Sequence, residues 1–305
     1  MKAIYHRTVV RAGRTVEIIE TFPTKYGDGF TRENAKQGNT SAQQAAYNEE
    51  LAIRRLTRIL NENFVPEDWF ITLHYERHTR PPTLSAAKTQ LTYYLRKLKR
   101  RYKRFGIDPK IVKATAYGER GALHHHIVIT KGVPISTITA LWKEHIGASI
   151  KARPPEYRAL YDTGEYSSLA AYIYGQAAKS KAPDEDFLDT FGMKHWSCSR
   201  NCKIPQPEKP KVIEDIKWKE PPVAWAGYFI DTDSIRADVN PVTGRPYLFY
   251  RMVKLPPGFV CHDDNGNRIT GSAAIRYTRR KNADWIRNNW KVLNPKGDIV
   301  PRKRE

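Results

Sequence analysis

The chain has 305 residues, enough for one large or two modest domains. Apolar residues make up 40% of the sequence, which excludes a wholly disordered protein. The formal net charge of +20 opposes compaction and exceeds what solubility requires, so we expect a polyanionic partner. No apolar run approaches the ~20 residues of a membrane span. We therefore expect nucleic acid as the partner and no membrane.

The cytoplasm is the expected location. The first residues alternate apolar and basic side chains and lack the apolar core of a signal peptide. The three cysteines, Cys198, Cys202 and Cys261, leave an odd thiol and no disulfide framework, which fits a reducing compartment.

Residues 1–64 form the first predicted segment. Strand-like alternation is followed by a polar, turn-rich stretch and then by a helix over residues 42–64. In that helix Leu51, Leu56 and Leu60 fall on one apolar stripe.

Residues 65–205 are predicted to form an α+β domain. Ser85 is the expected N-cap of its first helix, and Gly106 the expected stop. Strands that alternate with helices but include a tight hairpin favour an antiparallel sheet covered on one face. The predicted strands cover residues 68–76, 111–119 and 122–130, and the predicted helices cover residues 85–106, 135–147 and 166–181.

Residues 206–305 are predicted to be a linker and a basic C-terminal extension. The stretch from about residue 183 to 222 is rich in Pro, Lys and Glu, which is typical of a linker or extended arm. Strand-like patches at 227–236 and 245–255, a Gly/Asn/Asp turn and a basic helix follow. The sequence leaves open whether they form a second domain or extend the first.

Three consecutive histidines lie on the second strand of the predicted hairpin. If Arg120 and Gly121 are its tip, Tyr117 pairs with His124 and Thr115 pairs with His126. Side chains alternate along a strand, so His124 and His126 share one face while His125 points to the other. Glu119 is expected on the face of His124 and His126. The three side chains would be a divalent-metal set with open positions, whereas a structural role for the histidines is the alternative.

The last predicted helix of this domain carries two tyrosines. Tyr172 and Tyr174 lie about 200° apart on a helix, so they cannot serve one site together. Both could be half-buried packing residues. Because the phenol pKa is about 10, a tyrosine nucleophile needs a polarised electrophile or a nearby cation.

Three motifs in this order resemble those of HUH endonucleases: "FITLHY", "GERGALHHHIVI" and "SSLAAYIYGQAAK". Within that superfamily the chain is most similar to rolling-circle replication initiators of bacterial plasmids and phages, over roughly residues 65–205. The resemblance implies an RRM-like central antiparallel sheet with the histidine strand in its middle, flanked by an N-terminal helical segment and a C-terminal extension.

The resemblance also implies a reaction. A tyrosine attacks a phosphate of single-stranded DNA at a replication origin, leaving a 5′-phosphotyrosine and a free 3′-OH that primes synthesis. By position, His124, His126 and Glu119 match the ligands of an Mn²⁺ or Mg²⁺ ion, and Tyr172 matches the nucleophile, with Tyr174 as the fallback. Family members commonly carry a lysine three residues after the tyrosine; that position is Gly175 here, and Lys179 is the expected substitute.

A run of seven cations within nine residues lies on the predicted helix at 85–106. Like charges at this spacing repel, and a phosphate backbone would relieve the repulsion, although most such runs are solvated faces. The expected DNA-binding residues are Arg96, Lys97, Lys99, Arg100, Arg101, Lys103 and Arg104.

Other interpretations remain open. A single-tyrosine transposase or conjugative relaxase would share the fold and the chemistry. The third interpretation is a non-catalytic, basic RRM-like module that binds single-stranded nucleic acid and in which the histidines are structural. His195, Cys198 and Cys202 suggest zinc only weakly, because a fourth ligand is missing. No P-loop motif occurs, so unwinding would require a host helicase, alongside a host polymerase. An oligomer is possible.

Overall fold

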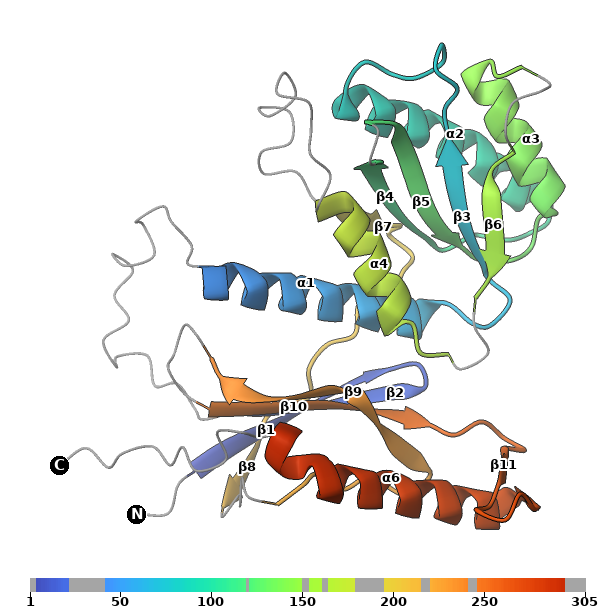
Figure 1. Cartoon of the computed structure of the whole chain (residues 1–305). Coiled ribbons are helices and arrows are strands. Elements are labelled where there is room, and N and C mark those ends of the chain that lie inside the picture. The colour runs from blue at the N-terminus through green and yellow to red at the C-terminus, as the bar shows by residue number, and fades with distance from the viewer. Residues whose placement is uncertain are drawn as a thin grey trace. The chain divides into compact units, whose positions relative to one another are not determined.

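The computed structural model divides the chain into two units. Unit 1 comprises Met1–Leu51 and Pro205–Glu305, and unit 2 comprises Ala52–Ile204. The structure describes residues 4–21, 42–118, 121–149, 154–160, 164–178, 195–214, 220–240 and 246–293. The chain is a mixed α+β protein with antiparallel sheets (Figure 1). None of the helices in these ranges combines the length and the apolarity needed to cross a membrane.

Unit 2 is built on a five-stranded sheet in which every neighbouring pair is antiparallel. The strand order is β6-β3-β5-β4-β7, so the histidine strand β5 is central. All seven residues of β5 are buried, which explains its continuous apolar and histidine sequence. The strands are β3 (Trp69–His74), β4 (Ile111–Tyr117), β5 (Leu123–Ile129), β6 (Glu156–Ala159) and β7 (Trp196–Cys198).

Helices cover both faces of this sheet, not one as the sequence predicted. On one face lie α2 (Leu84–Arg104) and α3 (Ile135–Ile146). On the other lie α4 (Ser167–Ala178) and the second half of α1 (Ala42–Asn63) (Figure 1). On this second face, α1 packs against the sheet through its apolar stripe, in which Leu56 and Leu60 are fully buried.

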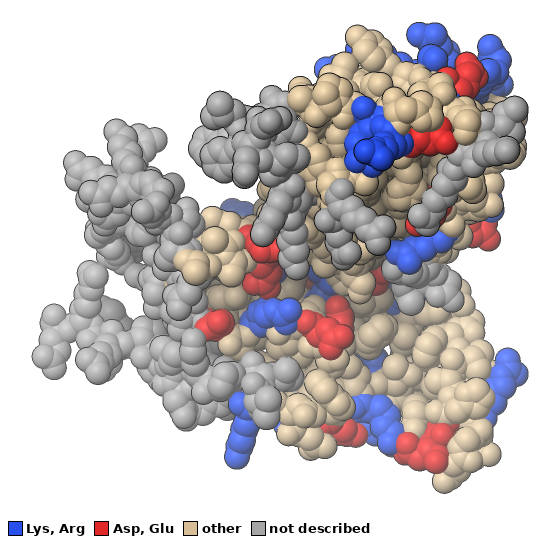
Figure 2. Space-filling view, turned by 45° about the horizontal axis from the view of Figure 1, so that its top comes forward, with Lys and Arg blue, Asp and Glu red and all other residues tan. Residues whose placement is uncertain are grey.

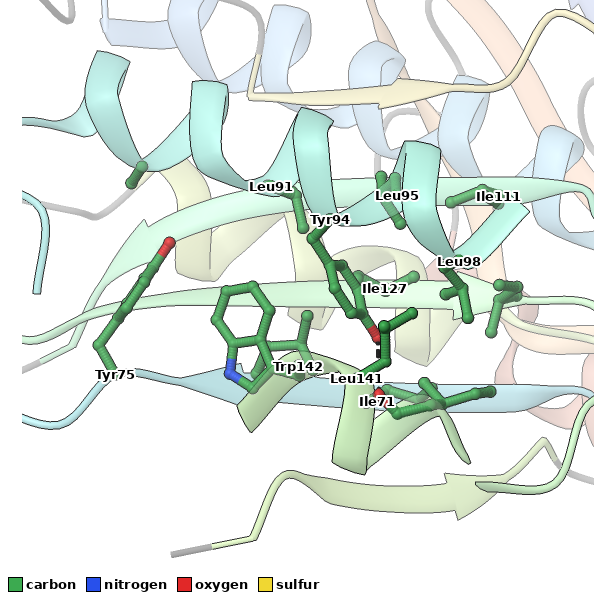
Figure 3. Close-up of a cluster of buried hydrophobic side chains, with 14 of the residues drawn as sticks. Ile71, Tyr75, Leu91, Tyr94, Leu95, Leu98, Ile111, Ile127, Leu141 and Trp142 are labelled. Carbon is green, nitrogen blue, oxygen red and sulfur yellow. Dashed lines mark hydrogen bonds between the residues drawn. The ribbon is translucent and has the colours of Figure 1, made fainter. Parts of the chain in front are cut away.

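Aromatic side chains fill the core between the sheet and α2. Tyr94 of α2 and Trp142 of α3 are fully buried and meet edge to face, with ring centroids 5.0 Å apart (Figure 3). The Tyr94 hydroxyl donates to the carbonyl of Ile138 (3.0 Å), and the Trp142 indole donates to the carbonyl of His74 (2.9 Å). These bonds satisfy the polar ends of both rings, as burial requires.

The ends of α2 differ slightly from the sequence prediction. Thr83, not Ser85, is the N-cap, and its hydroxyl accepts from the amide of Ala86 at 3.1 Å. The helix begins at Leu84, one residue before the predicted start, and Leu84 is buried in the core. Gly106 follows the helix with φ of 71°, as expected of a stop residue.

Two edge strands were not predicted. β6 lies in a stretch that the sequence left unassigned, and all of its residues are exposed, so it carries no hydrophobic alternation. β7 lies in the predicted linker region and has only three residues. Backbone pairing with β3 and β4, and not side-chain pattern, defines both strands.

Unit 1 contains a second five-stranded antiparallel sheet, ordered β8-β1-β2-β10-β9. One face packs on α6 (Gly271–Leu293) through Ile286 and Trp290. β11 (Val260–His262) and β12 (Arg268–Thr270) form a separate hairpin. The sheet strands are β1 (Ile4–Ala12), β2 (Thr15–Thr21), β8 (Lys211–Glu214), β9 (Tyr228–Val239) and β10 (Pro246–Lys254).

This division differs from the three consecutive segments predicted at 1–64, 65–205 and 206–305. The first two strands pair directly with strands from the C-terminal third: β1 pairs with β8, and β2 pairs with β10. The two ends of the chain therefore build one sheet, and unit 2 is inserted between them. Sequence patterns report local structure and carry no signal for this long-range pairing.

Candidate functional site

The hairpin that carries the histidines has a three-residue tip. Tyr117 pairs with Leu123, Ala116 with His124 and Ala114 with His126, a shift of one residue from the predicted register. The Gly118 amide donates to the carbonyl of Ala122 at 2.8 Å, and Gly121 has φ of 67°. A glycine in the left-handed region is typical of three-residue hairpin loops, whereas the prediction assumed two residues.

The observed register places small residues beside the two imidazoles. His124 and His126 project to the α4 face of the sheet, where their neighbours on β4 are Ala116 and Ala114. The Nε2 atoms of His124 and His126 lie 3.1 Å apart. Nδ1 of His124 lies 3.2 Å from the Ala122 carbonyl oxygen, and Nδ1 of His126 lies 3.2 Å from the Thr72 hydroxyl. The two Nε2 atoms are therefore fixed toward each other.

This pair fits a divalent metal ion. Two nitrogens bound to one ion at about 2.0–2.1 Å lie about 2.9–3.4 Å apart for bond angles between octahedral and tetrahedral. Burial and the neighbouring His124 and His74 lower the pKa of His126 to about 3, and burial also lowers the pKa of His124. Both rings are thus neutral at pH 7, as metal ligation requires.

The third predicted ligand, Glu119, lies outside the described residues. Within the described part of the chain, no three His, Cys, Asp or Glu side chains form a group that could hold a metal ion. Two further donors nevertheless share this face: His74 of β3 pairs with His124, and Glu156 of β6 pairs with Thr72. The His74 ring lies 6.1 Å from that of His124, and its Nε2 lies 3.8 Å from Glu156 Oε1.

Tyr172 lies next to the histidine pair. Its ring centroid is 5.2 Å from that of His126 and 6.1 Å from that of Phe70. Tyr172 is 44% exposed, so part of the residue is open to solvent. Tyr174 instead contacts His195, with ring centroids 5.2 Å apart. Of the two tyrosines, the structure brings Tyr172 to the histidines, whereas Lys179 lies outside the described residues.

Arg158 supplies a cation on the same face that sequence reasoning missed. Arg158 pairs with Phe70 across the β6–β3 ladder, and its guanidinium lies over that ring, 5.0 Å from the centroid. Phe70 in turn stacks on His126 at 5.6 Å. Since β6 has no strand-like pattern, nothing in the sequence indicated that Arg158 would approach the histidines.

His125 has a different environment. It is fully buried on the α2 face, where its Nε2 lies 2.8 Å from the Tyr75 hydroxyl and its Nδ1 lies 2.9 Å from the Thr115 hydroxyl. Its ring also meets Trp142 at 90°. With both nitrogens engaged by buried hydroxyls, His125 is a core residue, as the strand alternation predicted.

The predicted DNA-binding cations lie on the solvent side of α2. Lys99 is partly buried, and the other six are exposed. On the molecular face drawn in Figure 2, the described basic and acidic side chains are interspersed among neutral residues. The charge excess is therefore not spread as one broad patch over that face.

The weak zinc interpretation gains no support from the described residues. Cys202 is buried with its Sγ near the Ser199 hydroxyl (3.4 Å) and the Ile111 carbonyl (3.9 Å). Cys198 is half-buried against the α4-side core, and all three cysteines are free thiols.

Comparison with known proteins gives no match: no protein-family model, no curated protein and no solved structure is similar to this chain at a significant level.

Proposed function

We propose that unit 2 is an HUH-type endonuclease and strand transferase that nicks and rejoins single-stranded DNA to initiate rolling-circle replication. The main support is the half-exposed Tyr172, whose ring lies 5.2 Å from His126, while the Nε2 atoms of His126 and His124 are 3.1 Å apart. The five-stranded antiparallel sheet with β5 at its centre agrees with the RRM-like fold that this proposal includes.

The proposed step is a transesterification at phosphorus. The Tyr172 oxygen attacks, an O–P bond forms, and the bond from phosphorus to the 3′-oxygen breaks. The phenolic proton leaves to solvent, and the departing 3′-oxygen takes up a proton, so a 5′-phosphotyrosine and a 3′-OH result. A bound Mn²⁺ or Mg²⁺ would supply Lewis-acid polarisation of the phosphate. Arg158, with its guanidinium over Phe70, would stabilise negative charge on the phosphate oxygens.

The third metal ligand has two candidate sources. Glu119 is the one that the resemblance implies, whereas His74 and Glu156 already share the face of His124. The sources can be separated by measuring Mn²⁺ affinity by calorimetry. Loss of affinity in Glu119→Gln with little change in His74→Gln and Glu156→Gln assigns the role to Glu119, and the reverse assigns it to His74 or Glu156, whichever variant loses affinity.

In this proposal the basic helix α2 contributes contacts to the DNA backbone. Phosphate contacts position a strand and carry no sequence information, so the recognition of an origin would need further residues. The seven cations proposed to act in this way are Arg96, Lys97, Lys99, Arg100, Arg101, Lys103 and Arg104. A host helicase and a host polymerase would be required to extend the 3′-OH.

The decisive experiment is to incubate the protein with single-stranded DNA and Mn²⁺ and to isolate the covalent adduct. Mass spectrometry of the attached peptide should identify Tyr172. The Tyr172→Phe variant should give no adduct, while Tyr174→Phe, the matched control on the same helix, should keep it. An adduct that persists in Tyr172→Phe and disappears in Tyr174→Phe would reject the assignment of Tyr172.

The rival functions predict different results. A transposase or relaxase would form the same adduct but on transposon-end or transfer-origin strands, so the preferred substrate separates it from an initiator. A non-catalytic binding protein would bind DNA with no adduct and no divalent metal. No separate structural observation favours either rival.

A further inference from the structure

A groove runs between α2 and the edge strand β7 on the α2 side of unit 2. It consists of two adjoining cavities of about 410 and 280 Å³, which share Thr92 and Lys113 as lining residues. We call it the α2–β7 groove. Its cationic lining residues are Lys88, Arg96, Lys99, Lys113 and Arg200.

The groove lies on the opposite side of the sheet from the histidine pair. Lys113 of β4 pairs with Ile127 of β5, and Ile127 belongs to the core under α2. Strand alternation turns its neighbour His126 to the other face. A ligand in the groove therefore occupies a place distinct from the candidate catalytic site.

Four of the five cations of the groove are poorly compensated. The carboxylate in its lining, Asp108, accepts a hydrogen bond from the Asn201 amide at 2.9 Å. Among the described residues, Arg96, Lys99, Lys113 and Arg200 form no ion pair with a carboxylate. Such a gathering of like charge opposes folding and is relieved by an anion.

Lys113 is the clearest case because it forms part of the floor of the groove. Its ammonium donates to the Thr92 hydroxyl at 3.4 Å, and burial together with the nearby Lys99 lowers its pKa. Burying a cation without a counter-charge is costly unless a bound anion stabilises it.

The α2 wall presents its polar groups at regular intervals. Lys88, Thr92, Arg96 and Lys99 follow one another at steps of three or four residues and so share one side of the helix. With a rise of about 1.5 Å per residue, Lys88 and Lys99 are about 16 Å apart along the axis. Hydroxyl and amide groups of Thr92, Ser199 and Asn201 lie between or opposite these cations.

We propose that the α2–β7 groove binds the phosphodiester backbone of a single DNA strand. Arginine, lysine, threonine, serine and asparagine are the side chains that contact nucleic-acid phosphates. The charge of a single strand repeats along one chain, which matches the line of cations on α2. A duplex would reach the protruding side chains but not the recessed Lys113. The choice of DNA rests on the proposed function, whereas binding itself needs neither Tyr172 nor the metal ligands.

The test measures DNA binding by the full chain in EDTA, where no adduct forms. Fluorescence anisotropy would follow a labelled oligothymidylate of about 16 nucleotides, long enough for a single-strand site. The double variant Lys99→Glu/Arg200→Glu removes two cations of the groove. The matched control, Arg77→Glu/Arg80→Glu, makes the same charge change at two exposed residues of unit 2 that neither line the groove nor belong to the seven cations of α2.

We expect the groove variant to weaken binding at least tenfold more than the control. The slope of log K against log salt should fall in magnitude by about 1.4, because each lost contact to a single strand contributes about 0.7. Lys113→Met should also weaken binding without loss of folded protein, since it replaces a half-buried charge by an apolar side chain of similar length.

Three outcomes would overturn the inference. Equal weakening by the groove variant and the control would mean that only net charge matters. Equal affinity for a duplex of the same sequence, with the same loss in the groove variant, would reject a single-strand site. Tighter binding of a polyglutamate peptide, lost in the groove variant, would assign the groove to an acidic peptide.

The adduct assay keeps the two proposals separable. Groove binding without an adduct would refute the endonuclease and leave the groove assignment standing. An adduct, combined with normal oligothymidylate binding by the groove variant, would refute the groove assignment and leave the endonuclease standing.

Discussion

His125, the middle histidine of β5, tests whether its side chain belongs to the core while its two neighbours on the strand face the candidate site. His125→Ala removes a fully buried imidazole whose two nitrogens engage Tyr75 and Thr115. Since Tyr75 directly follows β3 and Thr115 lies on β4, the substitution breaks side-chain links between β5 and the segments on both of its sides. We expect a large loss of stability in unit 2.

The magnitude follows from the contacts. Two hydrogen bonds contribute about 1 kcal/mol each, and leaving a buried hydroxyl without a partner costs about 1–3 kcal/mol. The cavity left beside Trp142 adds a cost similar in kind to that of large-to-small core substitutions, about 2 kcal/mol or more. Allowing for partial relaxation, His125→Ala should lower the free energy of unfolding by about 3–5 kcal/mol.

The control is His124→Ala, one residue away on the same strand. His124 gives up its contacts to the Ala122 carbonyl and to Nε2 of His126, on a face where its neighbour on β4 is the small Ala116. We expect it to cost about 1–2 kcal/mol, less than His125→Ala, because no buried hydroxyl of the core loses its partner. Urea unfolding followed by circular dichroism and tryptophan fluorescence would measure both variants, and a double-mutant cycle with Tyr75→Phe should give a coupling of about 1 kcal/mol.

If His125→Ala costs less than 1 kcal/mol, or no more than His124→Ala, the assignment of His125 to the core is wrong. The proposal that His124 and His126 bind a ligand while His125 packs in the core would then lose its structural basis, because all three histidines would contribute alike to stability.

Three further predictions concern other parts of the chain. Thr83→Ala should lower stability by about 1 kcal/mol while Ser85→Ala changes it little, because Thr83 caps α2; equal effects in urea unfolding would contradict this. Gly175→Ala should raise stability by about 0.5–1 kcal/mol, since the added methyl meets no atom within 4 Å and alanine favours the helix; a lower melting temperature would count against it. In unit 1, Arg251→Met should cost about 3–5 kcal/mol because it removes the guanidinium that lies 3.2 Å from the buried Glu17 carboxylate, and adding Glu17→Leu should recover most of that loss; no recovery in the double variant would reject the pair as the cause.

Several features of unit 2 could be predicted from the sequence because they depend on local periodicity. The alternation of β5 separates His125 from His124 and His126 whatever the register, since neighbouring side chains on a strand always point to opposite faces. The helices at α2, α3 and α4 follow from apolar spacing, and glycine at position 106 marks the end of α2. The angular separation of Tyr172 and Tyr174 likewise follows from helix geometry alone.

Other features of the candidate site could not be predicted from the sequence, because they depend on how separate segments of the chain pair in the tertiary structure. The three-residue tip of the hairpin moved Ala114 and Ala116 beside the imidazoles and sent Thr115 to His125. Loop length sets hairpin register, and a one-residue error moves every cross-strand neighbour to the other face. The approach of Arg158 depends on β6, an exposed strand defined by backbone pairing with no pattern of its own.

The sequence by itself determined the composition class, the positive charge, the positions of most helices and strands, and the division of the histidines between two faces. Those properties depend on residue type and on spacing over a few positions. Only the tertiary structure decided that β1 and β2 share a sheet with β8, β9 and β10, that Tyr172 rather than Tyr174 adjoins His126, and that part of the α2 charge lines a groove. Each of these depends on contacts between residues far apart in the chain, and such contacts leave no periodic signal within either partner.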